Sequence, residues 1–337
     1  MKEKNLKIIL GRHNLDAAVF FQDSYIPYFS GVSLSDREWR ENAVLVIGKT
    51  AVLYVRRLEV ERVKTASKVD VMPLEELNIP NSIGVNGRAF TISHMNSMKE
   101  KKVVDISHEL EQLRMVKEEA EIKLIREACR IGDSVFSEVV KNWKFMTEGE
   151  VRQFIVKEIE NRRASPSFNP IVASGKNAAF PHYQGNDKLS EGFCVIDFGV
   201  CWKGYCSDMT RTVYLGNPSE EEKELYSKVL ESQKAGITAV KPGTSAEDVD
   251  FSARNKLGKL QNLFIHSLGH QLGIDVHDAG FRIGPEVKSK LAKNMVITIE
   301  PGIYMHGKYG IRIEDDIVVG RQVLTESKKS LIIIPYS

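Results

Sequence analysis

The sequence VIDFGVCWKGYCSDMTRT, residues 195–212, decides how the second half of the chain folds. Lys203-Gly204 supplies a two-residue turn between two runs of β-prone residues, which predicts a β-hairpin. In that register Asp208 faces Gly199, and Asp197 lies on the same face as Gly199. The two carboxylates are then diagonal neighbours on one face of the hairpin, where their side chains can converge.

A second stretch with the same plan is VITIEPGIYMHGKYGIRIEDDIVV, residues 296–319. Its acids Glu300 and Glu314 are symmetric about Gly307, so they face each other if the segment folds back as a loose hairpin. Each predicted hairpin therefore contributes a carboxylate from both of its strands.

These four acids are expected to surround cations. An acid on a strand usually lies on a solvated face, but Asp197 and Glu300 directly follow the apolar runs 195–196 and 296–299, which predicts burial. Crowded carboxylates repel one another, and burying even one of them without a partner costs several kcal/mol. Two divalent ions would balance four carboxylates, and His270 offers an imidazole beside them. The sequence therefore predicts a two-metal site.

Length and composition set milder limits. The chain has 337 residues, 42% of them hydrophobic, which favours two domains over one. No apolar run approaches the ~20 residues of a membrane span, and the start shows no small-residue cleavage site, so we expect a cytoplasmic protein without a membrane partner. A net charge of +2, from 47 basic and 45 acidic residues, excludes a polybasic stripe and implies no nucleic-acid partner.

The four cysteines lack paired C-x-x-C spacing, so we expect them to pack in the core or across strands rather than bind metal. In the register of the first hairpin Cys201 faces Cys206, close enough for a cross-strand disulfide. A reducing cytosol favours thiols at both positions.

Residues 1–108 are predicted to form a small α/β domain. Short apolar strands, at residues 17–21, 43–47, 51–55 and 69–72, alternate there with amphipathic pieces. A charged amphipathic stretch with apolar residues three or four apart then runs from Leu110 to Val139. We place the domain boundary just before it, so that the second domain spans residues 109–337.

The second domain is predicted to contain an internal repeat. Thr147-Glu150 and Thr244-Glu247 resemble capping boxes that open a helix, and each follows a longer helix, at about 118–142 and 219–240. The order helix, capped helix, hairpin with two acids thus occurs twice. A pseudo-twofold axis between the two copies would bring the hairpins together with the metal ions between them.

Five segments in order carry a specific resemblance. They are NPIVASGKNAAFPHY (169–183), DFGVCWKGYCSDMTRT (197–212), HSLGHQLGIDVHDAG (266–280), TIEPGIY (298–304) and IRIEDD (311–316). With them the chain resembles the creatinase/prolidase/methionine aminopeptidase family, the pita-bread metallopeptidases, and is most similar to the short Xaa-Pro dipeptidases and aminopeptidases. The resemblance implies an α/β (α+β) fold in which a small N-terminal α/β domain precedes a pita-bread catalytic domain with a pseudo-twofold repeat.

The resemblance also implies a role for each metal ligand. Asp197 would chelate one ion, Asp208 and Glu314 would bridge the pair, and His270 and Glu300 would complete the second ion. This mostly hard donor set suits Mn²⁺ or Co²⁺, with Zn²⁺ and Fe²⁺ as alternatives. A hydroxide bridging the ions would attack the peptide bond before a proline in the second position of a small peptide, and Glu300 would shuttle the proton.

Two further histidines match outer positions of the family site. His182 and His277 would bind the substrate carbonyl region and stabilise the oxyanion, while His266 is expected to be structural or to lie behind the ligands. Gly269 and Gly273 flank His270 too closely for a stable helix, which predicts extended backbone there. Relatives often have a proline shortly after the histidine and acid at 277–278, and its absence here leaves the shape of the substrate pocket open.

Two other functions fit the same fold, namely a non-catalytic binding protein and a creatinase-like hydrolase of a non-peptide C–N bond. Retention of all five ligands favours an enzyme over the first. The resemblance further implies a homodimer in which the polar segment 35–40 of one subunit helps to roof the other's site. Arg37 or Arg40 would then meet the carboxylate of a two-residue substrate.

Overall fold

A computed structural model describes residues 2–32 and 43–336. The chain divides into two compact units, residues 1–114 and 115–337, which are described separately below. A domain boundary after residue 108 stays a prediction. The segment 35–40, predicted to roof a partner's site, lies outside the described residues.

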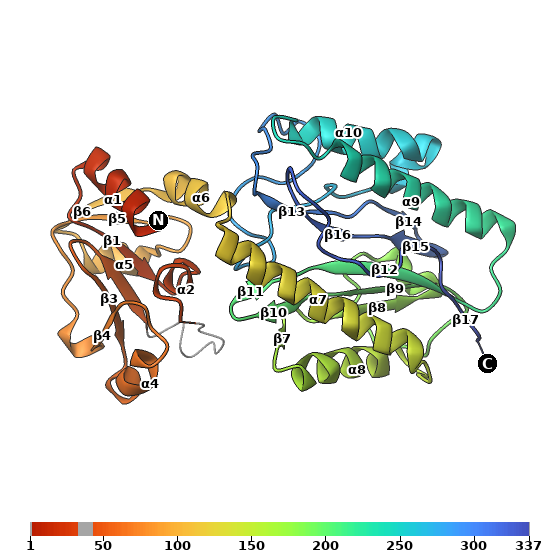
Figure 1. The fold of residues 1–337 in the computed structure, drawn as a ribbon, viewed down its shortest axis with the longest axis horizontal. Helices are drawn as coiled ribbons and strands as arrows, with labels where there is room; N and C mark the ends of the chain where they lie inside the picture. The colour runs from red at the N-terminus through yellow and green to blue at the C-terminus, as the bar shows by residue number, and fades with distance from the viewer. Residues whose placement is uncertain (1, 33–42, 337) are drawn as a thin grey trace. The chain divides into compact units, whose positions relative to one another are not determined.

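The first unit contains one mixed six-stranded sheet in the order β4-β3-β2-β1-β5-β6 (Figure 1). Its strands are β1 (Ala17–Phe21), β2 (Val44–Ile47), β3 (Ala51–Val55), β4 (Asp70–Pro73), β5 (Ser82–Val85) and β6 (Lys102–Asp105). Its helices are α1 (Lys2–His13), α2 (Tyr25–Ser30), α4 (Val60–Lys64), α5 (Ile92–Ser97) and α6 (Ser107–Met115), with 3₁₀ turns η1 (Arg57–Glu59) and η2 (Leu74–Glu76). The four predicted strands are confirmed to within a residue, whereas β5 and β6 were not predicted.

The second unit surrounds its strands with two helix pairs (Figure 1). The pairs are α7 (Glu119–Lys141) with α8 (Glu148–Asn161), and α9 (Glu220–Ala239) with α10 (Ala246–Leu257). Apolar residues of α9 and α10, such as Val229 and Val249, pack in one buried cluster with strand residues such as Ile299. The predicted order of long helix, second helix and acid-bearing hairpin therefore occurs twice.

The strands of the second unit form small sheets. One sheet has the order β17-β12-β9-β8, formed by β8 (Ile171–Ser174), β9 (Gly192–Phe198), β12 (Met209–Leu215) and β17 (Ile333–Ile334). The others are β11-β10-β7, β13-β16 and β14-β15, formed by β7 (Ser165–Pro166), β10 (Val200–Trp202), β11 (Tyr205–Cys206), β13 (Val296–Ile299), β14 (Gly302–Met305), β15 (Tyr309–Arg312) and β16 (Asp315–Val318). Two 3₁₀ segments, η3 (Gly175–Ala179) and η4 (Gly258–Leu263), complete the unit.

Helix caps agree with the sequence at one predicted box and differ at the other. Thr147 opens α8 as a full capping box, accepting a hydrogen bond from the Glu150 backbone N–H. At α10 the cap is Ser245 rather than Thr244. The reason is that Thr244 belongs to the preceding turn, where its N–H donates to the Lys241 carbonyl, so the helix begins one residue later.

The hairpin registers are those predicted. Cys201 pairs with Cys206, and Asp197 pairs with Thr210 on the neighbouring strand. In the second hairpin Ile299 pairs with Asp315. The hairpins also contact each other, because the Glu314 N–H donates to the Thr210 carbonyl at 3.1 Å. Their acids are thereby brought to one place.

Candidate metal centre

The acids of the site lie where strands end. Asp197 is the penultimate residue of β9, and Asp208 directly precedes β12. Glu300 and Glu314 occupy the breaks between β13 and β14 and between β15 and β16, where Pro301 interrupts the ladder. A residue at a strand end keeps a fixed backbone while its side chain is released from the pleated surface, which suits a ligand.

His270 comes from an irregular segment and is held against β13. Its carbonyl accepts from the Thr298 N–H at 2.9 Å, and its own N–H donates to the Thr298 hydroxyl at 3.1 Å. The backbone there makes isolated β-bridges at Gly269 and Gln271. The predicted extended backbone is therefore confirmed.

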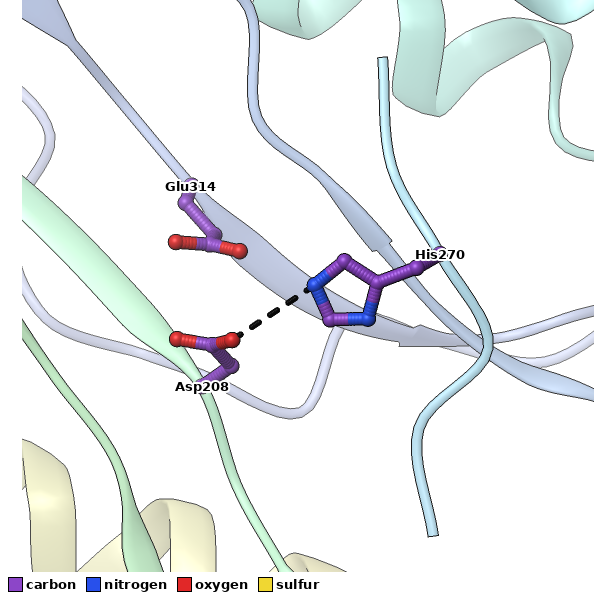
Figure 2. Close-up of side chains that lie close together, drawn as sticks. All are labelled: Asp208, His270 and Glu314. Atoms are coloured by element: carbon purple, nitrogen blue, oxygen red, sulfur yellow. Dashed lines mark ion pairs between the residues drawn. The ribbon is translucent and has the colours of Figure 1, made fainter. Parts of the chain in front are cut away.

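Asp208, His270 and Glu314 come from separate segments of the chain, and their side chains point toward one another (Figure 2). Asp208, His270 and Glu314 each offer one ligand atom, and these atoms all lie within 4.8 Å of one another. His270 Nε2 is 3.6 Å from Asp208 Oδ2 and 3.5 Å from Glu300 Oε1. Asp197 lines the same cavity as these four residues, so the structure brings all five predicted ligands together.

The carboxylates present oxygen atoms that nothing in the described protein satisfies. Asp197 Oδ1, Asp208 Oδ1 and Glu314 Oε1 are buried without a hydrogen-bond partner. A buried acceptor without a partner is costly, and three in one cavity are the arrangement expected around a divalent cation. The donor set of carboxylates with one imidazole fits ions such as Mn²⁺ or Co²⁺.

The pKa shifts of these side chains also agree with a site for divalent cations. Burial, together with the Glu314 carboxylate, raises the pKa of Asp208 well above its ordinary value. Burial and repulsion from Asp197 raise the pKa of Glu314 to about 8. Burial lowers the pKa of His270 to about 4, which keeps the imidazole neutral and its nitrogen able to bind a cation.

Behind the acids lies a buried arginine that the sequence analysis did not single out. Arg312 Nη2 contacts Asp197 Oδ2 at 2.6 Å, and its Nε donates to the Thr210 hydroxyl at 3.0 Å. That hydroxyl donates in turn to Glu314 Oε2 at 2.7 Å. Arg312 thus fixes two of the acids so that each turns one unpartnered oxygen into the cavity. Its signal in the sequence is an arginine between Ile311 and Ile313 on a buried strand, which demands a partner.

The two acids after Glu314 have other partners. Asp315 is fully buried and contacts Arg211 at 2.7 Å and Lys329 at 2.6 Å. Asp316 accepts from the Asp208 N–H at 2.9 Å and so holds the backbone of that residue. Within the run of three acids, only Glu314 faces the cavity.

The cavity has a volume of about 1150 Å³ and contains the two outer histidines. His182 and His277 are both solvent-exposed on its wall. The His277 ring lies 4.2 Å from the His270 ring, centroid to centroid, and burial lowers the pKa of His277. His266 is also part of the wall, where its Nε2 lies 3.0 Å from the Tyr304 hydroxyl.

The run that follows residues 277–278 contains a glycine with a positive φ. Gly280 has φ of +128°, which proline cannot adopt because its ring fixes φ near −65°. Two residues later Arg282 donates to the Ser267 hydroxyl at 3.1 Å and lies on the cavity wall.

Comparisons with known proteins agree with the site and the fold. Residues 123–321 match Metallopeptidase family M24, and residues 3–116 match the Creatinase/Prolidase N-terminal domain. The Xaa-Pro dipeptidase of Pyrococcus horikoshii is 34% identical over 98% of this chain and 99% of its own length. A prolidase crystal structure from Pyrococcus horikoshii OT3 superposes with a TM-score of 0.90 at 31% identity, covering 98% of this chain and 99% of that one. For an X-Pro aminopeptidase from Thermotoga maritima MSB8 the TM-score is 0.89 at 30% identity, with the same coverage of both chains.

The chain belongs to metallopeptidase family M24. The predicted fold class is confirmed, with an N-terminal α/β domain followed by the metallopeptidase domain. Within the described residues, none of the helices combines the length and apolar character that crossing a membrane requires.

Proposed function

We propose that this chain is a two-metal exopeptidase that cleaves the peptide bond before proline in short peptides. The observation that carries the proposal is the set of three unpartnered carboxylate oxygens that converge with His270 in one large cavity. The names of the relatives, Xaa-Pro dipeptidase and X-Pro aminopeptidase, support the choice of substrate.

Five side chains would hold the ions. Asp197 would bind one ion, His270 and Glu300 the other, and Asp208 and Glu314 would lie between them. Bound divalent ions would supply a nucleophile from water near neutral pH and polarise the substrate carbonyl. Arg312 keeps Asp197 and Glu314 oriented for this purpose through the contacts described above.

The remaining steps belong to the protein's own side chains. Glu300, partly buried beside His270, carries the proton from the attacking water to the leaving proline nitrogen. His182 and His277 stand on the open wall of the cavity and donate to the substrate carbonyl region as negative charge develops there. Phe180 and Ile265 give the mouth an apolar edge and are 46% and 65% exposed.

A reconstitution assay tests the proposal. The purified chain is stripped with a chelator, reloaded with Mn²⁺ or Co²⁺, and offered Ala-Pro, Ala-Ala, Ala-Pro-Ala and creatine. We expect metal-dependent release of proline from Ala-Pro and no turnover of Ala-Ala or creatine. Glu158→Gln, which changes a partly buried acid of α8 that is paired with Arg162 and does not line the cavity, is the matched control and should show wild-type activity. Equal cleavage of Ala-Pro and Ala-Ala, or turnover of creatine alone, would contradict the proposal.

The identity of the ions, the oligomeric state and the cellular location are proposed from the resemblance to the family, not from the geometry of the site. We propose Mn²⁺ or Co²⁺ as the ions, a homodimer as the assembly and the cytoplasm as the location. Metal analysis of the protein purified from its source and light scattering would test the first two.

A further inference from the structure

The segment 273–280 carries His277 into the cavity wall without help from a helix or a β-ladder. Within the described residues, only a few backbone hydrogen bonds hold this segment in place. The Cys206 N–H donates to the Gly273 carbonyl at 2.7 Å, and the Asp278 N–H donates to the Gln271 carbonyl at 2.9 Å. An exposed histidine on such a segment needs another constraint to keep one position.

A buried ion pair directly beside His277 supplies that constraint. Lys117 Nζ lies 3.1 Å from Asp278 Oδ2, and the two side chains are 1% and 2% exposed. Lys117 is itself anchored, because its N–H donates to the Asn294 carbonyl at 3.0 Å. The next residue along, Met295, leads into β13, which also holds His270. The pair therefore ties the His277 segment to the same support as the metal-binding histidine.

The local sequence makes room for this pair. A Cβ on Gly273 would collide with the Asp278 carboxylate and lie 3.1 Å from Lys117 Cε, so glycine leaves the space the pair fills. The Gln271 carbonyl accepts from the Asp278 N–H and also lies 3.0 Å from His270 Nδ1. A shift of Asp278 would thus reach His277 through the peptide bond and His270 through this shared carbonyl.

Such a pair contributes little net stability, because desolvating two charges offsets their attraction, and an apolar pair of similar volume is often as stable. Its particular contribution is geometry. Resting on the proposed peptidase function, we infer that Lys117 is a positioning residue that, through Asp278, holds His277 at the place where it meets the substrate carbonyl. Neither Lys117 nor Asp278 touches the reacting atoms.

The test separates positioning from stability with two variants. Lys117→Met removes the positive charge beside the buried Asp278 carboxylate, whereas Lys117→Met/Asp278→Leu replaces the pair by apolar side chains. We expect the single variant to lose both thermal stability and kcat, and the double variant to regain stability. In the double variant kcat for Ala-Pro should stay about 10- to 100-fold low while KM changes little, as for a misplaced catalytic group. Metal content measured by mass spectrometry should equal that of wild type.

Arg162→Met is the matched control, since it breaks the partly buried pair with Glu158 on α8, away from the cavity. It should lower stability slightly and leave kcat unchanged. A double variant that regains full kcat along with stability would overturn the inference. So would a loss of metal that parallels the loss of kcat, because the pair would then act on His270 alone.

A readout without substrate keeps the inference independent of the proposed function. The histidine Cε1–Hε1 signals of the ¹³C-labelled protein, loaded with diamagnetic Zn²⁺, are assigned with His277→Gln and His182→Gln. We expect the His277 signal to shift or broaden in the double variant while the His182 signal stays in place. Wild type that fails to cleave Ala-Pro would refute the peptidase proposal, whereas an unmoved His277 signal would refute the positioning role.

Discussion

Replacing Asp208 by asparagine should remove at least one metal ion and yet stabilise the metal-free fold. The side chain is 7% exposed, and its Oδ1 atom has no partner in the described protein. Burial and the Glu314, Asp197, Asp316 and Glu300 carboxylates all raise its pKa. Asparagine has nearly the same shape but carries no charge, so it removes this repulsion together with the ligand.

The size of the gain follows from the protonation of Asp208. In the metal-free folded chain burial and the neighbouring carboxylates disfavour the ionised form of Asp208, whereas in the unfolded chain the acid ionises with an ordinary pKa near 3.9. A pKa raised by one costs the fold about 1.4 kcal/mol at a pH above both values, and the cost declines as the pH falls toward the unfolded value. Asparagine escapes this cost, so its advantage should shrink as the pH falls.

The assay compares urea unfolding of wild type and Asp208→Asn, both stripped of metal, at pH 7 and pH 5. We expect the variant to be more stable by more than about 1.4 kcal/mol at pH 7, the cost of a pKa raised by one, with a clearly smaller difference at pH 5. Added Mn²⁺ should stabilise wild type strongly and the variant weakly, because only wild type binds the full metal complement. Turnover of Ala-Pro by the variant should be near zero.

Two results would refute the reasoning. A metal-free variant that is less stable than metal-free wild type at both pH values would show that Asp208 is not repelled by its neighbours. A variant that keeps wild-type turnover after losing metal would show that the ligands have been wrongly assigned.

Further predictions concern pH, thiols and substrate length. Since the pKa of Glu314 is raised to about 8, the folded metal-free chain holds a proton that the unfolded chain releases. The free energy of unfolding, measured in urea, should therefore fall by up to about 2 kcal/mol as the pH rises from about 6.5 to 8. Excess Mn²⁺ should abolish this fall. All four cysteines are thiols in the structure, although Cys201 faces Cys206. Ellman titration of the denatured, unreduced protein should therefore find four thiols. A count of two thiols would indicate a disulfide. Arg37→Ala with Arg40→Ala should raise KM for Ala-Pro and spare Ala-Pro-Ala, and equal effects on both peptides would argue against a roof over the site.

Much of the fold could be predicted because short-range rules governed it. The turn at Lys203-Gly204 fixed the register of the first hairpin, since both residues adopt positive φ, at 49° and 82°. The α10 cap was misplaced by one residue because Thr244 and Ser245 are both good caps, and only the turn contacts of Thr244 decide between them. Strands β5 and β6 escaped prediction because Ser82–Val85 contains a glycine and Lys102–Asp105 is flanked by charges.

The residues of the candidate site also differ in how well the sequence predicts them. Acids at the ends of buried strands can be recognised from the sequence, because a carboxylate that follows a buried apolar run requires a partner. The partners that orient the ligands are harder to find. Asp278 and Lys117 are far apart in the sequence, and each alone has the appearance of an ordinary surface charge. Only the fold shows that they form a buried pair beside His277.

The charge balance of the site favours two ions over one. The four carboxylates, three of them buried and Glu300 partly buried, sum with a neutral His270 and the buried Arg312 guanidinium to three negative charges. One divalent ion would leave the cavity with a net negative charge, which opposes the oxyanion that forms on the substrate carbonyl. Two divalent ions leave one positive charge, which attracts that oxyanion and lets all four carboxylates ionise at neutral pH. The same arithmetic gives Arg312 a second role, because without its charge two ions would only neutralise the acids, and the site would lose the net positive charge that attracts the oxyanion.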